Sequence, residues 1–166
     1  MKLFWYAILI LLFGGLFFYM ANNVFTAQLD SSRIYYAYMN NAPLKVAIAN
    51  TPETRSQGLS GLKSIPQNHG LLFVFPDNEK YGIWMKGMLF DLDIIWLNEQ
   101  MRVVFIKDQV TPDTYPTIFY PPTNARYVLE TNAGFVEEQG IQEGDKLKLI
   151  SFRPSIFNFG GIFSGN

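Results

Sequence analysis

A long apolar run at the N-terminus limits what the rest of this chain can be. After Lys2, residues 3–21 are about nineteen consecutive apolar residues or glycines, and polarity returns at Asn22. Roughly 20 such residues, each rising about 1.5 Å in a helix, match a hydrocarbon core about 30 Å thick. We therefore expect residues 1–21 to form one transmembrane helix that contacts the lipid bilayer through residues 3–21.

Two other interpretations of the apolar run stay open. A cleaved signal peptide ends in small residues at its cleavage site, but the two available sites, residues 19–21 and 25–27, begin with Tyr and Phe. A buried core helix is the third interpretation. The retained anchor fits the residues best, because no small-residue cleavage site follows the run.

The charges beside the apolar run predict its orientation. Lys2 and the amino terminus precede the run, and the next cation along the chain is Arg33. Positive charges close to a span favour the cytoplasmic side. We therefore expect a single-pass protein of the cytoplasmic membrane, with its N-terminus inside and its folded domain extracytoplasmic. The absence of cysteine is compatible with export and with the cytoplasm alike.

Composition divides the chain into four predicted segments. These are a transmembrane anchor (1–21), a polar and aromatic tether (22–42), a β domain (43–151) and an apolar, glycine-rich tail (152–166). The formal net charge is −1 and the basic residues are scattered, which argues against nucleic acid as a partner.

The pattern between residues 43 and 151 predicts a mainly β domain. Apolar side chains alternate over 44–49, which is typical of a half-buried strand. Further strands are expected at 70–76, 81–86, 93–97, 102–107, 126–130 and 146–151. Short helices are expected at 52–59, with Thr51 as cap and Pro52 first, and at 132–139. Together they predict a compact sandwich or barrel of about seven strands with two short helices.

Residues 108–125 are predicted to be a long loop without regular structure. They contain four prolines and show no periodicity. Loops of this length in compact domains are usually functional or disordered, and Tyr115, Phe119 and Tyr120 argue against disorder. The loop is expected to act either as a lid over a binding site or as a plug for the open end of a barrel.

Four sequence blocks carry a resemblance to a known family. They are 51–59 (TPETRSQGL), 70–76 (GLLFVFP), 84–86 with 92–95 (WMK and LDII), and 125–130 (ARYVLE) running on to Gly144 and Asp145. In this order, over about residues 43–150, the chain resembles domain-of-unknown-function family 192. The resemblance implies a small, mainly β domain, frequently exported or membrane-anchored, with no established biochemical activity.

Five residues within these blocks form the predicted ligand site: Arg55, Trp84, Lys86, Asp93 and Glu130. The four charges lie in apolar or turn-forming segments, where an unpaired charge is costly, so we expect them to meet in the fold. A Trp ring beside charged groups is typical of sites for small polar or sugar-like ligands. The alternative is that Trp84 belongs to the core.

The two carboxylates each have a structural alternative. Asp93 and Asp91 are two positions apart and would share a strand face. Alternatively, Asp91 lies in the preceding loop and Asp93 alone enters the strand, where it either caps the strand or pairs with Lys86 or Arg55. Glu130 is expected to end a strand immediately before a helix, where free N–H groups stabilise a carboxylate.

Metal and cofactor chemistry is not expected from this sequence. His69 is the one histidine and there is no cysteine, so a metal site would need an uncommon set of ligands. No motif assigns a catalytic residue, and no cofactor-binding motif is present.

The sequence therefore predicts a membrane-anchored, extracytoplasmic β domain that acts as a non-catalytic module. Its expected partner is a small polar ligand or an envelope protein. One alternative is a small hydrolase or transferase that uses Asp93 or Glu130 with Lys86. The other is an envelope-assembly scaffold.

Overall fold

The computed structural model describes residues 34–150, which lie within one unit of the chain, Ser31–Asn166. The predicted anchor (1–21), most of the tether and the tail (152–166) lie outside the described residues. Among residues 34–150, no helix is both long and apolar enough to cross a bilayer. The transmembrane helix therefore stays a prediction.

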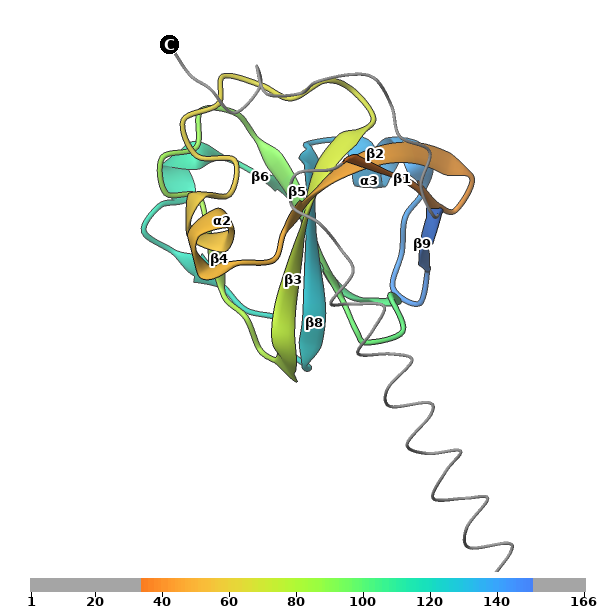
Figure 1. The fold of residues 1–166 in the computed structure, drawn as a ribbon. Coiled ribbons are helices and arrows are strands. Elements are labelled where there is room, and N and C mark those ends of the chain that lie inside the picture. The colour runs from red at the N-terminus through yellow and green to blue at the C-terminus, as the bar shows by residue number, and fades with distance from the viewer. Residues whose placement is uncertain (1–33, 151–166) are drawn as a thin grey trace, which may run out of the picture. The chain divides into compact units, whose positions relative to one another are not determined.

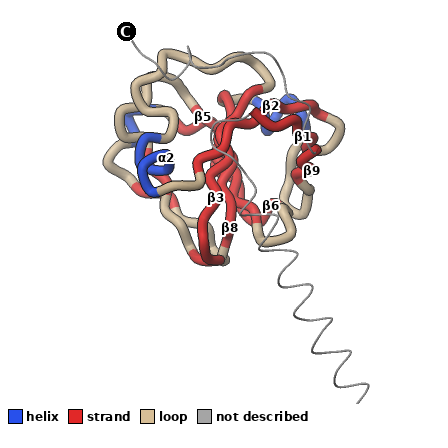
Figure 2. Tube along the Cα trace, in the orientation of Figure 1, coloured by secondary structure: helices blue, strands red, loops and turns tan. Residues whose placement is uncertain are grey.

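Strands are the main regular structure of the described domain (Figure 2). In chain order the elements are β1 (Ile34–Met39), β2 (Ala42–Ala49), α2 (Pro52–Gln57), β3 (His69–Glu79), β4 (Ile83–Trp84), β5 (Leu92–Leu97), β6 (Val103–Val110), η1 (Pro112–Thr114), β7 (Ile118–Phe119), β8 (Ala125–Asn132), α3 (Phe135–Gln139) and β9 (Leu147–Ile150). The predicted class, mainly β with two short helices, is confirmed for these residues.

The described strands other than β4 and β7 form a seven-stranded sheet in the order β6-β5-β8-β3-β2-β1-β9. Its pairs are antiparallel except for β2 and β3, which are parallel and are connected through α2. The sheet curls into a half-barrel, with β3 and β8 side by side at its centre (Figure 1). Its two edges meet at a bridge between Arg102 and Lys146, beside which Leu147 N–H donates to the Met101 carbonyl at 2.9 Å.

Strand β1 corrects the predicted tether. Ile34–Met39 pair with β2 on one side and with β9 on the other, so the folded domain begins before residue 43. Ala37 and Met39 are buried, whereas Tyr36 and Tyr38 are exposed. Buried and exposed side chains thus alternate along β1. The sequence does not make this pattern obvious, because Met39 is the one large apolar residue at the two buried positions and Tyr36 and Tyr38 face outward.

The predicted helices form with the expected end signals. The Thr51 side chain accepts from the Thr54 N–H at 3.2 Å, and the Thr54 hydroxyl oxygen accepts from the Thr51 N–H at 3.0 Å. This capping box begins α2, which ends at Gly58, where φ is +52°. Helix α3 begins three residues later than predicted and ends, as predicted, at residue 139, with Gly140 in the left-handed region after it.

The predicted loop 108–125 contains regular structure. Strand β6 extends to Val110, η1 follows, and β7 pairs with β4, so the predicted strand 81–86 is reduced to Ile83–Trp84. Gly82 permits this pairing, because a Cβ at that position would lie 2.5 Å from Ile118 Cγ2. Phe119 packs against the core, whose buried members include Leu92, Ile94 and Trp96.

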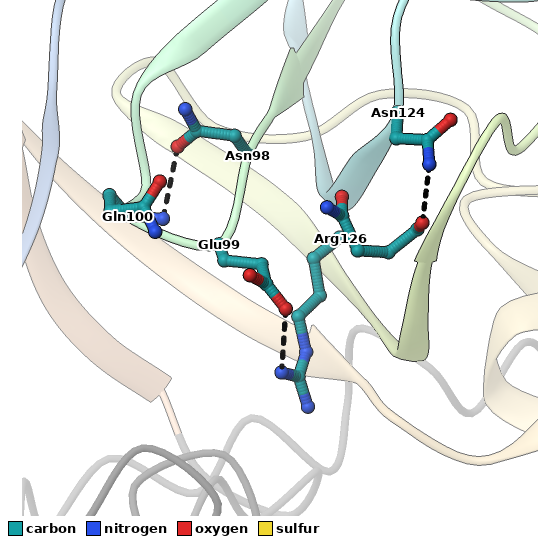
Figure 3. A network of polar contacts seen from close by, with 6 residues as sticks. Asn98, Glu99, Gln100, Asn124 and Arg126 are labelled. Carbon is teal, nitrogen blue, oxygen red and sulfur yellow. Dashed lines mark hydrogen bonds and ion pairs between the residues drawn. The ribbon is translucent and has the colours of Figure 1, made fainter. Parts of the chain in front are cut away.

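Residues 98–101 form the tight turn between β5 and β6. The Asn98 side-chain oxygen accepts from the Gln100 N–H at 3.0 Å, which holds the turn (Figure 3). Beside it, Arg126 of β8 forms an ion pair with Glu99 at 3.5 Å. Asn124 donates to the Asn78 carbonyl at 2.8 Å. These contacts hold the turn, β8 and the end of β3 together at one end of the sheet.

Candidate functional site

A cavity of about 120 Å³ lies between α2, β3, β4 and β8. Because one water molecule occupies about 30 Å³ in the liquid, the cavity holds only a small group. Its lining residues are Arg55 to Ser60 on α2 and the following turn, Phe73 and Phe75 on β3, Gly82 to Trp84 around β4, Met88, and Glu130 on β8. The β2–α2–β3 crossover brings α2 over this part of the sheet.

Glu130 is the buried acid of this cavity. Its position on β8 pairs with Leu71 of β3 and with Ile94 of β5. Glu130 is 5% exposed, and its Oε2 has no hydrogen-bond partner. Burial raises the pKa of Glu130 to about 8. At pH 7 most of this carboxyl is therefore protonated and has an O–H group to donate.

The expected place of Glu130 beside a helix was wrong. Helix α3 begins at Phe135 rather than at residue 132, after the left-handed Gly134. Glu130 therefore lies within β8, between two neighbouring strands, and not at the N-terminus of α3.

Arg55 forms part of the cavity wall and is fixed by two backbone carbonyls. Its Nη1 donates to Asn50 O at 2.7 Å and to Val74 O at 3.0 Å. Its guanidinium carbon lies 5.4 Å from the centre of the Phe75 ring. These contacts link α2 to β3 and hold a positive charge at the cavity.

Trp84 is a lining residue and is 47% exposed, so it is not a core tryptophan. The Lys86 Nζ lies 5.4 Å from the centre of the Trp84 ring, and the Tyr115 ring meets it edge-on at 5.9 Å. Lys86 itself is not among the lining residues. Its carbonyl accepts from the Ser60 hydroxyl at 2.7 Å, which fixes the segment after β4 against the turn after α2.

Asp93 has a different role from Glu130. It is fully buried on β5, with Oδ1 accepting from Gln109 N–H and Oδ2 from Val136 N–H, both at 2.8 Å. Asp93 therefore stabilises the start of α3, the role expected of Glu130, and it does not pair with Lys86 or Arg55. Asp91 is exposed before β5, so the two aspartates do not form a carboxylate pair within the strand.

The fold thus brings three of the five predicted residues to one cavity and separates the others. Arg55, Trp84 and Glu130 line it, Lys86 lies over Trp84, and Asp93 is engaged elsewhere. Sequence reasoning missed Gln57 and Ser60, which also line the cavity. Gln57 lies in the same sequence block as Arg55, and Ser60 directly follows that block, which was an available signal. The parallel β2–β3 crossover that brings these residues to the sheet was not visible in the sequence.

The described residues contain no group of three or more His, Asp or Glu side chains placed to hold a metal ion. His69 lies at the start of β3, where its Nδ1 is 3.0 Å from the Gln67 carbonyl oxygen.

Fold and cavity together define a small half-barrel β domain with one buried acid open to a ligand-sized space. The particular family follows from its sequence. The chain belongs to DUF192, the family described as "Uncharacterized ACR", whose model matches residues 36–149. This confirms the family resemblance, and the match includes most of β1.

Two archaeal proteins are similar to the chain. The UPF0127 protein TK1120 of Thermococcus kodakarensis is 35% identical over 113 residues, which are 67% of this chain and 66% of that protein. A UPF0127 protein of Thermococcus gammatolerans is 36% identical over 102 residues, 60% of this chain and 63% of that protein. The chain thus spans a little under two thirds of the length of these relatives.

Two solved structures share the fold. A protein of Sinorhizobium meliloti 1021 described as a "putative transcription regulator" has a TM-score of 0.68 and 28% identity, covering 72% of this chain and 96% of its own. A protein of unknown function from Novosphingobium aromaticivorans has a TM-score of 0.66 and 24% identity, covering 69% and 84%. The second likeness concerns the fold alone.

Proposed function

We propose that this domain is a non-catalytic binding module whose cavity takes a small polar ligand, or the polar end of a larger one. The observation that carries the proposal is Glu130, a buried acid that lines a cavity beside the exposed Trp84 ring and has an oxygen, Oε2, without a hydrogen-bond partner. A buried polar group that is not fully hydrogen-bonded costs about 1–3 kcal/mol, and a ligand that bonds to the Glu130 carboxyl recovers part of that cost.

The hydrolase or transferase alternative receives less support from the geometry. It requires Asp93 or Glu130 to act as an acid or base together with Lys86. Both oxygens of Asp93 accept backbone N–H groups, and the Lys86 ammonium lies over Trp84 outside the cavity lining. Glu130 is thus the one predicted acid that lines the cavity, and its Oε2 has no hydrogen-bond partner.

We further propose that residues 1–21 anchor this module in the cytoplasmic membrane with the domain on the extracytoplasmic side. The support is the apolar run of 3–21 and the positive charge of Lys2 before it. Full-length protein should stay in the membrane fraction after carbonate extraction, and added protease should cleave the domain in spheroplasts. A soluble product lacking the first twenty or so residues would contradict the anchor.

Binding is tested on the full-length protein in detergent. Glucose, glutamate, spermidine and adenosine, as representatives of four polar classes, are titrated by calorimetry against the wild type, Trp84→Ala and Leu89→Ala. Leu89 is 59% exposed and does not line the cavity, so it is the matched control. At least one compound should bind the wild type and Leu89→Ala equally and bind Trp84→Ala at least tenfold more weakly. Equal binding by all three proteins, or binding by none, would contradict the proposal.

A further inference from the structure

The cavity lining combines a buried acid, apolar walls and one positive charge. At pH 7 the Glu130 carboxyl is mostly neutral because burial raises its pKa to about 8. Leu59, Phe73 and Ile83 supply apolar walls around it. Arg55 contributes a positive charge to the wall, and Lys86 places another beside Trp84.

This distribution of charge disfavours ions of either sign in the cavity. A cation would be repelled by Arg55 in the wall and would need Glu130 to lose its proton in an apolar setting. An anion would meet the Arg55 guanidinium, whose Nη1 already donates to the Asn50 and Val74 carbonyls, and would have the Glu130 O–H as a further donor among apolar walls. Burying a charge without full pairing is far more costly than burying a hydrogen-bonded neutral group.

We propose, building on the proposed function, that the group entering the cavity is a neutral hydroxylated one, such as the edge of a sugar or another polyol. A protonated carboxyl both donates and accepts a hydrogen bond, and so does an alcohol. An alcohol and the Glu130 carboxyl at the cavity wall therefore satisfy each other without burying net charge.

The size of the cavity and its rim agree with this ligand class. A volume of about 120 Å³ admits one edge of a sugar ring, while the rest of the ring lies outside. Trp84 is half-exposed at the cavity, where its ring offers an apolar surface to the C–H groups of a sugar. Gln57 and Ser60 line the same space. Gln57 Nε2 donates to the Ser60 carbonyl and the Ser60 hydroxyl donates to the Lys86 carbonyl, so each side chain keeps an oxygen that can accept from a further hydroxyl group.

Glu130 should make binding depend on pH. The charged or titratable groups on the elements packed around it are Glu53 and Arg55 on α2, His69, Asp77 and Glu79 on β3, Lys86 after β4, and Asp91 and Asp93 at β5. None of them contributes to the raised pKa, which has burial as its cause. Affinity for a neutral sugar should therefore be constant below about pH 7 and fall as the carboxyl ionises above pH 8.

Matched sugars test the proposal. Glucose, glucosamine and glucuronate share one ring and differ in charge, and galactose, galactosamine and galacturonate form a second such set. Each is titrated by calorimetry into the full-length protein at pH 6.5, and the best neutral sugar is then titrated up to pH 9.5. The neutral sugar of at least one set should bind at least tenfold more tightly than its two charged counterparts.

Three variants locate the effect. Glu130→Gln, which is neutral at every pH and both donates and accepts, should bind the neutral sugar at pH 6.5 and at pH 9.5 alike. Glu130→Leu should lose at least tenfold in affinity, and Leu89→Ala should behave as the wild type. Circular dichroism checks that each variant is folded.

Tighter binding of an amino sugar or a uronate, or full affinity in Glu130→Leu, would overturn this inference. It would also fail if no sugar binds while glutamate, spermidine or adenosine binds in a manner that depends on Trp84. In that case the proposed binding function stands. If none of these compounds binds, both proposals fail.

Discussion

Asp93 and Glu130 are two buried carboxyls on neighbouring strands with opposite hydrogen-bonding states. Asp93 receives two backbone N–H groups from Gln109 and Val136. Glu130 leaves Oε2 without a partner inside a cavity. The first arrangement is complete and stabilises the fold, whereas the second is complete only when a ligand is present. Substitutions at the two positions should therefore have different consequences.

Replacing Asp93 should destabilise the domain without acting on the cavity. In Asp93→Asn the amide NH₂ faces one of the two backbone N–H groups, so a buried donor loses its acceptor. We expect the free energy of unfolding to fall by about 3 kcal/mol, as for a buried group left unpaired. Urea unfolding measures this loss, with the exposed Asp91→Asn as control. Equal stability of the two variants would show that the buried Asp93 contacts are energetically unimportant.

Glu130 should make stability depend on pH in the direction opposite to that of an ordinary paired carboxylate. Its folded pKa of about 8 lies above its ordinary value of 4.5, so the folded state holds a proton that the unfolded state releases. Its contribution is fully favourable below about pH 4.5 and is lost as pH rises to about 8. Each unit of raised pKa corresponds to about 1.4 kcal/mol.

The matching variant is Glu130→Gln, which does not titrate. Between pH 5 and pH 8 the wild type should become steadily less stable relative to Glu130→Gln, and above pH 8 the difference in unfolding free energy should level off. Urea unfolding across this range, with both proteins in the same buffers, measures the change. A difference that does not vary with pH would contradict the buried, neutral carboxyl.

At the scale of elements, the pair β4–β7 connects the cavity to the proline-rich segment. Phe119 of β7 packs against the core, whereas Tyr115, five residues after Val110, is 45% exposed and meets Trp84. The two halves of the segment therefore differ with respect to the two roles left open by the sequence. Its β7 half packs against the core, as a plug would, and its Tyr115 ring contacts Trp84, which lines the cavity. The role of a lid stays a prediction.

Two alanine variants should separate these roles. Because Phe119 is only partly buried, Phe119→Ala should lower the unfolding free energy by about 2 kcal/mol, less than the 3–5 kcal/mol of a fully buried Phe. Tyr115→Ala should change stability by less than about 0.5 kcal/mol and weaken ligand binding. Thermal melts and calorimetry measure the two effects. The reverse pattern would show that Tyr115, not Phe119, supports the fold.

The sequence predicted secondary-structure elements well where residues next to each other in the chain determine where an element begins or ends. Thr51, Pro52 and Gly140 mark helix ends through side-chain caps and left-handed backbone, and the structure has those ends where the sequence places them to within two residues. The failures came from long-range pairing. Strand β1 is stabilised by β2 and β9, which lie on either side of it, and β7 exists because Gly82 lets it approach β4.

The candidate site also combines features that local sequence predicts with features that depend on long-range contacts. The sequence identified Arg55, Trp84 and Glu130 because each is a polar or aromatic residue inside an apolar block. It did not separate Glu130 from Asp93, since the partners of Asp93 are backbone N–H groups 16 and 43 positions away. Nothing local to either acid encodes that difference, so three-dimensional structure was needed to assign their roles.

At the scale of the whole described domain, β1 joins the edge strand β9 to the rest of the curled sheet. It pairs with β2 on one side and with β9 on the other, and β9 in turn lies near the start of β6, the opposite edge strand. Removing residues 1–39 should therefore unfold or strongly destabilise the domain, although the sequence alone suggested a boundary at residue 43. Removing residues 1–30 keeps β1 and should leave a cooperative thermal transition, measured by circular dichroism. Equal melting of both truncations would show that β1 is dispensable.

The protonation state of Glu130 is the most informative single measurement, because the proposed ligand class and the expected pH dependence both require a neutral carboxyl in the cavity. In protein labelled with ¹³C at glutamate, the side-chain carboxyl carbon of Glu130 is assigned by its loss in Glu130→Gln and followed from pH 4 to pH 10. We predict a midpoint near pH 8 that moves upward when a neutral sugar binds. A midpoint near the ordinary value of 4.5, unchanged by every compound tested, would contradict the account.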